Sequence, residues 1–349
     1  MMRKKLLRSV APVWLLLLVA AAAAQPRVIE AETARLRFLT LAPPQGGDAA
    51  EQAVLGLRGL PPSVIALRAF VVGAANAAPV RAAIEEHFRR RRQPLPVLTL
   101  VIVGALPGSA SLVLLEAVAA SKDRANPNGL AFISGQPASA EPSSPQVAPL
   151  VAKSLAALRL AHEGIGVAPE DILRATCFVS SLGDEPAARR LAKEAFPRAA
   201  LSFVQLQRTA PRALVECETV ARLRTRQRDP LRMLNPAGLP ASPNYSHVAL
   251  IGARRLLFSE AVSAAANEEA ARAAFAQLHR ALEAAGGSIR QTAMSHLYPT
   301  AQPGADLVRK IRFEFYDRDR PPASTLLLFE GLPNPDASFA LAVIAVGSQ

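Results

Sequence analysis

The chain has 349 residues, of which 50% are hydrophobic and 5% aromatic, and its formal net charge is +12. That length supports two or three domains with real cores, and the richness in Ala, Leu and Val favours close packing of helices on sheets over disorder. The two cysteines and five histidines show no metal-ligand spacing. We therefore expect neither a metal site nor a cofactor.

Residues 1–25 are predicted to be a signal peptide. Four cations lie within Met1–Arg8, an apolar run covers Val10–Ala24, and small residues precede Gln25, as a cleavage site requires. The alternative is a membrane anchor, but a run of about 15 residues is shorter than the roughly 20 that span a bilayer. We expect an exported protein, periplasmic or secreted, that has no membrane contact after cleavage.

The first unit is predicted at residues 30–121. Its apolar patterning indicates the order strand, helix, strand, helix, strand, strand. The strands are expected at 35–41, 63–72, 96–103 and 112–119, and the helices at 48–57 and 77–92. Within the second helix Val80, Ile84 and Phe88 recur at a spacing of four, which places them on one buried face.

The second of these helices ends in a basic block, Arg89–Arg92. Such a block could contact phosphates. Cations also suit the C-terminal end of a helix dipole, and no aromatic residues interleave the block as platforms for stacking bases. We therefore interpret it as a solvated helix end and expect no nucleic-acid partner.

The second unit is predicted at residues 128–225, with the same order of elements. Its strands are expected at 129–134, 172–179, 200–206 and 213–221, and its helices at 147–162 and 186–196. Cys177 and Cys217 fall on two of these strands. An exported protein permits a disulfide between them, whereas an Ala- and Val-rich core would hold both as small hydrophobic residues. We slightly favour the second interpretation.

The third unit is predicted at residues 235–347, again in that order. It is expected to open with a hairpin of strands 246–251 and 255–259. Its later strands are expected at 289–297, 323–329 and 339–345, and its helices at 267–285 and 305–315. Strands and helices that mix without strict alternation predict an α+β unit with helices on one face of a sheet.

The third unit resembles the Rid (YjgF-like, reactive intermediate deaminase) family. The resemblance is carried by short segments in a fixed order: Asn235-Pro236, Tyr245–Ala249, Leu256–Ser259, Leu282–Gly286, Pro322–Thr325 and Leu332-Pro333. The second unit adds Phe132–Gln136 and Val215–Ala221, and the first matches only in its hydrophobic pattern and last two strands. The chain thus looks like three tandem Rid-like repeats.

The resemblance implies a chorismate-mutase-like α+β fold. Members of the family are usually homotrimers with ligand pockets between subunits, so three tandem copies imply an intramolecular pseudo-trimer that is a monomer. Physical reasoning agrees, because a small sheet covered by helices on one face leaves an apolar face, and three such faces can bury one another.

The resemblance also implies a chemistry, of which this chain has lost a part. Active members hydrolyse enamines and imines to keto acids and ammonia, and an arginine in a Pro-x-Arg-Ser/Thr run clamps the substrate carboxylate through two hydrogen bonds. The matching positions here are Leu98, Leu201 and Ser324. Arg198 lies three residues before Leu201, and only a slipped strand register would bring it into the pocket.

Other pocket positions of the family are kept in part. A water-positioning glutamate matches Glu216, whose alternative role is that of a carboxylate at the rim of a strand. A pocket tyrosine matches Tyr245. The Ser-Gly position matches Ser134 and Ser259, although Glu260 follows Ser259 where the family has glycine.

Three hypotheses follow for the function. In the one that we favour, an exported Rid-like protein binds a small metabolite at clefts between repeats after losing the catalytic arginine. In the second, it is an active deaminase of 2-aminoacrylate-type imines, a hydrolase with Glu216 as the catalytic candidate beside Arg198 or Arg208. In the third, Arg89–Arg92 bind a nucleic acid or a partner. The expected ligand-binding residues are Ser134, Glu216, Arg198, Tyr245, Ser259 and Ser324.

Overall fold

The computed structural model describes residues 25–41 and 46–348. The predicted signal peptide therefore lies, except for Gln25, outside the described residues. No helix in the described ranges is long and apolar enough to cross a membrane.

Unit 1 is a four-stranded sheet with two helices. Its elements are β2 (Leu36–Leu41), α1 (Ala49–Leu57), β3 (Val64–Val72), α2 (Ala77–Arg90), β4 (Val97–Val103) and β5 (Val113–Ala120). The strand order is β2-β5-β3-β4, and only the β3–β4 pair is parallel. The basic block lies at the end of α2, as expected, where Arg89 and Arg90 both pair with Glu86.

Unit 2 repeats this plan. Its elements are β6 (Leu130–Ala140), α3 (Ala148–Glu163), β7 (Ile172–Val179), α4 (Glu185–Ala195), β8 (Ala200–Gln205) and β9 (Ala213–Arg222). The order β6-β9-β7-β8 matches that of unit 1 strand for strand, and again only the β7–β8 pair is parallel.

Unit 3 follows the same path. Its elements are β12 (Arg255–Ser259), β13 (Val262–Ala264), α5 (Glu268–Ala284), β14 (Gly287–Pro299), α6 (Gln302–Ile311), β15 (Ala323–Leu326) and β16 (Phe339–Gly347). The order β12-β16-β14-β15 contains one parallel pair, β14–β15. The predicted fold class, three tandem α+β units, is confirmed.

Two edge strands cross between units. The strand β11 (Val248–Ile251) pairs with β6 and with β10 (Leu231–Leu234), whereas β12 pairs with β1 (Val28–Glu32). The expected opening hairpin of the third unit is therefore divided between two sheets. The close approach of β11 to unit 2 explains Gly129, because a Cβ there would lie 2.0 Å from the Ile251 carbonyl oxygen.

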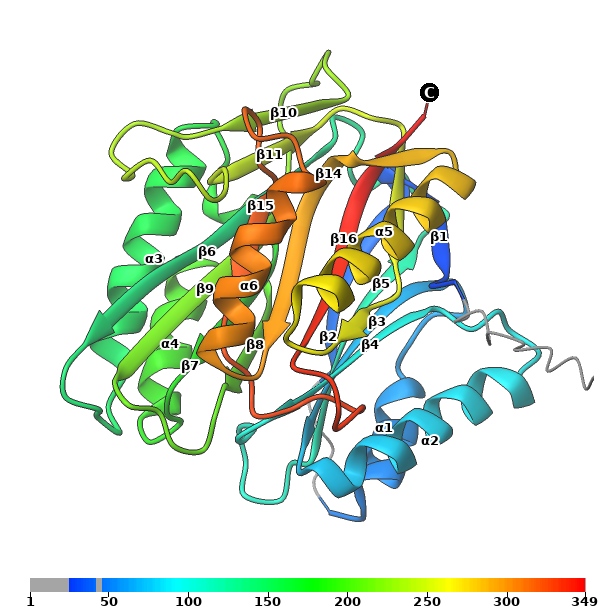
Figure 1. Cartoon of the computed structure of the whole chain (residues 1–349). Helices are drawn as coiled ribbons and strands as arrows, with labels where there is room; N and C mark the ends of the chain where they lie inside the picture. The colour runs from blue at the N-terminus through cyan, green and yellow to red at the C-terminus, as the bar shows by residue number, and fades with distance from the viewer. Residues whose placement is uncertain (1–24, 42–45, 349) are drawn as a thin grey trace, which may run out of the picture.

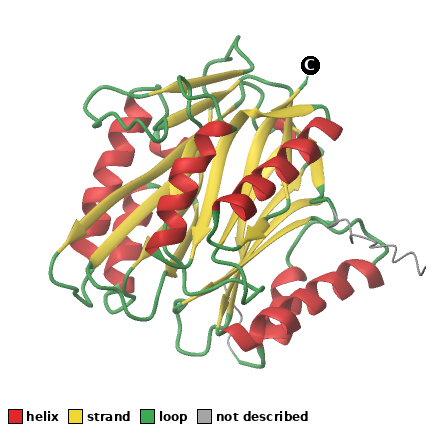
Figure 2. Ribbon diagram, viewed as in Figure 1, coloured by secondary structure: helices red, strands yellow, loops and turns green. Residues whose placement is uncertain are grey.

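The three sheets face one another, and the helix pairs lie on the outside (Figures 1 and 2). Each unit has a core between its sheet and its own helices. A further core joins all three units on the inner faces, with Phe70 from unit 1, Phe178 from unit 2 and Tyr298 from unit 3. The apolar faces thus bury one another as the sequence predicted.

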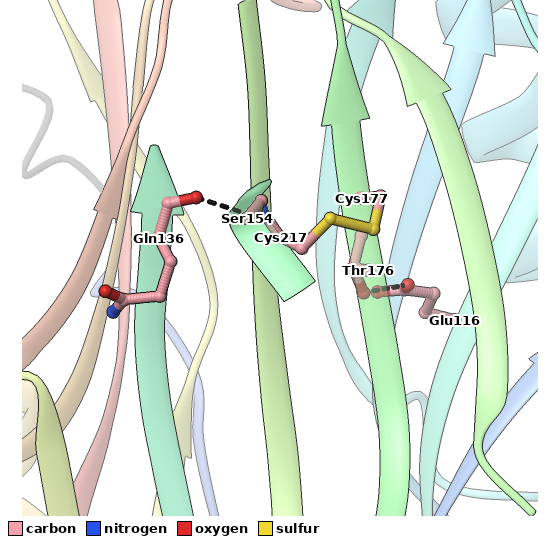
Figure 3. The surroundings of a disulfide bond; sticks show 6 residues. All are labelled: Glu116, Gln136, Ser154, Thr176, Cys177 and Cys217. Carbon is pink, nitrogen blue, oxygen red and sulfur yellow. Dashed lines mark hydrogen bonds between the residues drawn. A yellow bond between two sulfur atoms is a disulfide. The ribbon is translucent and has the colours of Figure 1, made fainter. Parts of the chain in front are cut away.

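The two cysteines form a disulfide, which corrects our preference for free thiols. Cys177 on β7 lies directly opposite Cys217 on β9, so their Cα atoms are 4.1 Å apart. Figure 3 shows the bond on the side of Ser154, a residue of α3, while the neighbouring Thr176 points to Glu116 of unit 1. Strand alternation therefore puts the disulfide on the helix side and Thr176 on the inner face.

Candidate functional site

A polar contact joins units 2 and 3 at the Ser-Gly position of unit 2. The Ser134 hydroxyl donates to the Ser246 carbonyl oxygen at 2.6 Å and accepts from the Ser324 backbone N–H at 2.9 Å. Ser324 is the residue that the sequence resemblance matches to the family's clamping arginine. The structure therefore brings together two of the predicted site residues, one from each unit, although 190 positions separate them.

The segment before β11 supplies a third predicted residue, Tyr245. Its ring contacts the His247 ring edge to face, with centroids 5.3 Å apart. His247 Nε2 lies 2.9 Å from the Pro240 carbonyl oxygen, which can only accept, so Nε2 carries the proton and Nδ1 accepts from the Gln136 amide at 3.2 Å. His247 thus bridges Gln136 and Pro240 and holds this segment in place.

Glu216 is a buried carboxyl group beside the same contact. It is 8% exposed and lies so close to Gly135 that a Cβ on Gly135 would be 1.9 Å from its Oε1 atom. Burial, and then the charge of Glu218, raises the pKa of Glu216 to about 8, against the opposing charge of Arg309. The group is therefore largely protonated at neutral pH and can donate a hydrogen bond.

A cleft of about 460 Å³ opens between units 2 and 3, and its lining residues do not include Glu216. Leucines from both units line it, at positions 206, 214, 326, 327 and 328, and its polar lining includes Arg212, Gln207, Gln302 and Arg309. Leu214 lies two residues before Glu216 on β9, so both side chains are on the inner face of the sheet. The cleft thus combines an apolar floor with two guanidinium groups and the Glu141 carboxylate.

Two predicted residues lie elsewhere. Arg198 is in an exposed turn before β8. Because Val204 is the β8 residue level with Phe178 and Glu216, Arg198 is about 20 Å away along the strand. Ser259 belongs to unit 3, where its hydroxyl accepts from the Val343 N–H at 2.9 Å and the adjacent Glu260 pairs with Arg27.

The clamp positions of the first two units face their own helices. Leu98 belongs to the helix-side core of unit 1, and Leu201 packs against that of unit 2. The Ser324 hydroxyl of unit 3 is buried without a hydrogen-bond partner among the described residues.

A buried polar network on the inner faces joins all three units, and sequence reasoning missed it. Arg68 of β3 donates to Glu116 of β5 at 2.8 Å and to Glu218 of β9 at 2.8 Å. Glu218 also contacts His296 of unit 3 at 3.2 Å and accepts from Thr325 at 2.5 Å. The charged groups are all nearly buried, so each depends on the others for solvation.

The register explains why this network forms. Arg68, Thr176 and His296 occupy the same position on the second strand of their sheets. In each unit this residue is paired with equivalent residues on the third strand and on the last strand of the unit. Three equivalent inward positions therefore meet. A charged residue inside each apolar strand run, Arg68 in 64–72 and Glu116 in 113–120, was the available signal in the sequence.

The neighbouring positive charges keep the two glutamates of the network ionised. Burial alone would raise the pKa of Glu218, but Arg68 and His296 hold it well below its usual value. Burial likewise opposes the charge on Glu116, and Arg68 and Arg174 lower the pKa of its carboxyl group. Both glutamates are therefore ionised. No group of three or more metal-ligating side chains occurs in the part of the chain that the structure describes.

Solved structures of Rid proteins are similar to this chain. A YjgF family protein from Neisseria meningitidis has 17% identity, covers 34% of this chain and 96% of its own, and has a TM-score of 0.26. A conserved Rid-family protein of unknown function from Yersinia pestis has 18% identity, covers 34% and 99%, and has a TM-score of 0.30. TdcF of E. coli, solved with bound serine, has 18% identity, covers 29% and 91%, and has a TM-score of 0.22.

The fold is Rid-like. The matched structures belong to the family that the sequence resembles, and the first two each span about a third of this chain. Neither a family model nor a curated protein matches the sequence. At these identities and TM-scores the matches carry nothing about activity, so the function of this Rid-like chain is argued from its own residues.

Proposed function

We propose that this chain is an exported Rid-like protein that binds a 2-keto acid with an apolar side chain between units 2 and 3. The supporting observation is the cleft of about 460 Å³, which has leucines on its floor and Arg212 and Arg309 in its lining. A guanidinium group pairs with a carboxylate through two hydrogen bonds. Mostly apolar clefts with a few placed polar groups are the usual sites for small ligands.

Glu216 gives the site its second polar contact. Since its pKa is raised to about 8, its carboxyl group is protonated at neutral pH and donates to an acceptor such as a keto oxygen. An ionised Glu216 would repel the carboxylate of a bound ligand. Protonation of Glu216 therefore also favours binding of the keto acid. Arg309, a lining residue of the cleft, also lowers the pKa of Glu216 through its charge, which supports a shared ligand for the two side chains.

The binding test measures the affinity of the chain for phenylpyruvate by titration calorimetry. We expect Arg309→Gln to weaken binding about tenfold, because one charge-assisted contact is lost. Glu216→Leu removes the donor and should weaken binding similarly, whereas Glu216→Gln keeps an N–H donor and should bind nearly as well as the wild type. Arg198→Gln, in the exposed turn, is the matched control. Equal affinity in all four variants would refute the site.

A second candidate function is hydrolysis of an imine. A carboxyl group whose pKa is raised to about 8 can act as a general acid at neutral pH. Glu216 would protonate the imine nitrogen, water would add to the carbon, and cleavage of the C–N bond would release ammonia and leave a keto acid. Glu216→Gln would then abolish turnover while it preserved binding.

The assay for this candidate supplies 2-aminoacrylate generated in situ and measures ammonia and keto acid against buffer. Because no arginine occupies any of the three clamp positions, we expect a rate equal to that in buffer. A rate well above buffer that falls in Glu216→Gln would make the chain an enzyme and overturn the binding-only function.

Export is tested separately. If residues 1–25 are a signal peptide, the mature protein recovered from the periplasm or medium lacks them. Mass spectrometry of the N-terminal peptide measures this directly, and a full-length chain retained inside the cell would contradict it.

A further inference from the structure

A second, smaller cavity lies mainly between units 1 and 3, with Arg174 of unit 2 at its side, next to the buried polar network of Arg68, Glu116 and Glu218. Its volume is about 60 Å³, which is room for a few waters or one small molecule. Strands β3 and β4 of unit 1 form one wall, and β12 and β16 of unit 3 form the other. Its polar lining residues are Arg68, Thr99, Glu116, Arg174, Ser259, His296 and Tyr298. None of these residues belongs to the cleft between units 2 and 3.

Arg68 presents an unused nitrogen to this region. Its Nε and Nη2 atoms donate to Glu116 and Glu218, but Nη1 is buried and has no hydrogen-bond partner among the described residues. The side chain is 9% exposed. A buried N–H group that makes no hydrogen bond costs about 1–3 kcal/mol, so an acceptor in the cavity would stabilise it.

Arg174 is in greater need of an acceptor. Its side chain is 7% exposed, and its nearest carboxylate oxygen, on Glu116, is 3.9 Å from Nη1. Its guanidinium carbon lies 5.4 Å from the centre of the Phe38 ring. The Arg174 guanidinium makes no hydrogen bond to any residue that the structure describes, although it carries five N–H groups. A buried guanidinium in this state needs water or an anion.

The two carboxylates of the network accept no hydrogen bond from Arg174. Glu116 accepts from Arg68 and Thr176, and Glu218 accepts from Arg68, His296 and Thr325. Donors of the two arginines therefore outnumber the free acceptors, and both arginines line one cavity. The Arg174 guanidinium therefore lacks a hydrogen-bonded carboxylate partner among the described residues.

We propose that this cavity binds a short-chain monocarboxylate of acetate size. One carboxylate edge pairs with the Arg174 guanidinium, and the other oxygen accepts from Arg68 Nη1. Ser259 and Thr99 offer hydroxyl groups, and the methyl group packs against Val97, Phe258 and Val343. A dianion such as sulfate fits poorly, because it would bring a second negative charge beside Glu116, which also lines the cavity.

This site is independent of the proposed cleft, and the probes separate them. Phenylpyruvate is too large for a cavity of about 60 Å³, whereas acetate fits both sites. Arg309→Gln removes a contact of the cleft between units 2 and 3 only. Arg174→Gln removes a contact of the smaller cavity only. Failure of one proposal therefore leaves the other standing.

The solution experiment follows thermal unfolding of the full chain in sodium acetate against sodium chloride and sodium sulfate at equal ionic strength. We expect acetate alone to raise Tm saturably, by about 1–2 °C at ten times its Kd. The shift should persist in Arg309→Gln and vanish in Arg174→Gln. A shift that chloride reproduces, or one that Arg174→Gln retains, would overturn the proposal.

A crystal structure of the wild type covers the case in which Arg174→Gln does not fold. Crystals are equilibrated with acetate at the concentration that saturates the thermal shift, or in chloride as the control. Planar density that bridges Arg174 and Arg68 Nη1 in acetate alone supports the site. Ordered water only, or binding at crystal concentration only, would overturn it.

Discussion

Arg68 of unit 1 and Glu218 of unit 2 form a hydrogen-bonded ion pair of 2.8 Å on the inner faces of their sheets, although 150 residues separate them along the chain. Both side chains are nearly buried, and His296 of unit 3 contacts the same carboxylate oxygen at 3.2 Å. One carboxylate thus links all three units. The units are held together by a shared network as well as by apolar packing.

Arg68→Met should destabilise the fold strongly. It leaves Glu116 and Glu218 buried without their main counter-charge, and breaking a buried pair in this way costs about 3–5 kcal/mol. Urea unfolding measures the free energy of unfolding. Arg89→Met is the control, because the pair of Arg89 with Glu86 is exposed and worth at most about 1 kcal/mol. An equal, small effect of both substitutions would contradict the buried network.

Glu216 should make stability fall as pH rises. Its pKa is about 8 in the folded chain against 4.5 as the ordinary value, so the folded state binds the proton more tightly. The stability from this group is complete below about pH 4.5 and is lost progressively up to about pH 8, at up to roughly 1.4 kcal/mol per pH unit. Glu216→Gln cannot titrate, so its stability relative to the wild type should increase between pH 5 and 8. A constant difference across that range would show that the Glu216 pKa is not raised.

Gly135 should be coupled to Glu216. Its added Cβ would lie 1.9 Å from Glu216 Oε1 and 2.5 Å from Cγ, so Gly135→Ala forces the glutamate aside at about 1–3 kcal/mol. In a Glu216→Ala background the same substitution should cost little. A double-mutant cycle measures the coupling free energy. Additive effects would mean that the two residues do not share this space.

The disulfide should contribute to stability. It joins Cys177 and Cys217, 40 residues apart in sequence, and closing a loop of that length in the unfolded chain corresponds to about 2–4 kcal/mol. The double variant Cys177→Ala/Cys217→Ala should lose that amount in urea unfolding, and adding a reductant should not affect it further. Thiol labelling in denaturant without reductant should find no free thiol in wild-type protein purified without reductant. Two labelled thiols would restore the free-cysteine interpretation.

The sequence by itself determined the repeated order of strands and helices. The spacing of apolar residues, for example Val80, Ile84 and Phe88 on α2, depends only on local periodicity, so each unit could be outlined without knowledge of the others. The same reasoning predicted that three apolar faces would meet. The resemblance to the Rid family, and not the periodicity, placed Ser134, Glu216 and Ser324 among the candidate site residues, and the structure brings Ser134 and Ser324 into contact.

Only the tertiary structure decided which charges meet and which strands change sheets. Arg68 and Glu218 become neighbours because equivalent inward positions of different sheets converge, a relation set by register and packing across 150 residues. Likewise, β11 pairs with β6 because its edge lies beside unit 2, and Cys177 meets Cys217 because the register of β7 and β9 places them opposite each other. Local patterns carry no information about such pairings, since they depend on the distance between residues in the folded chain.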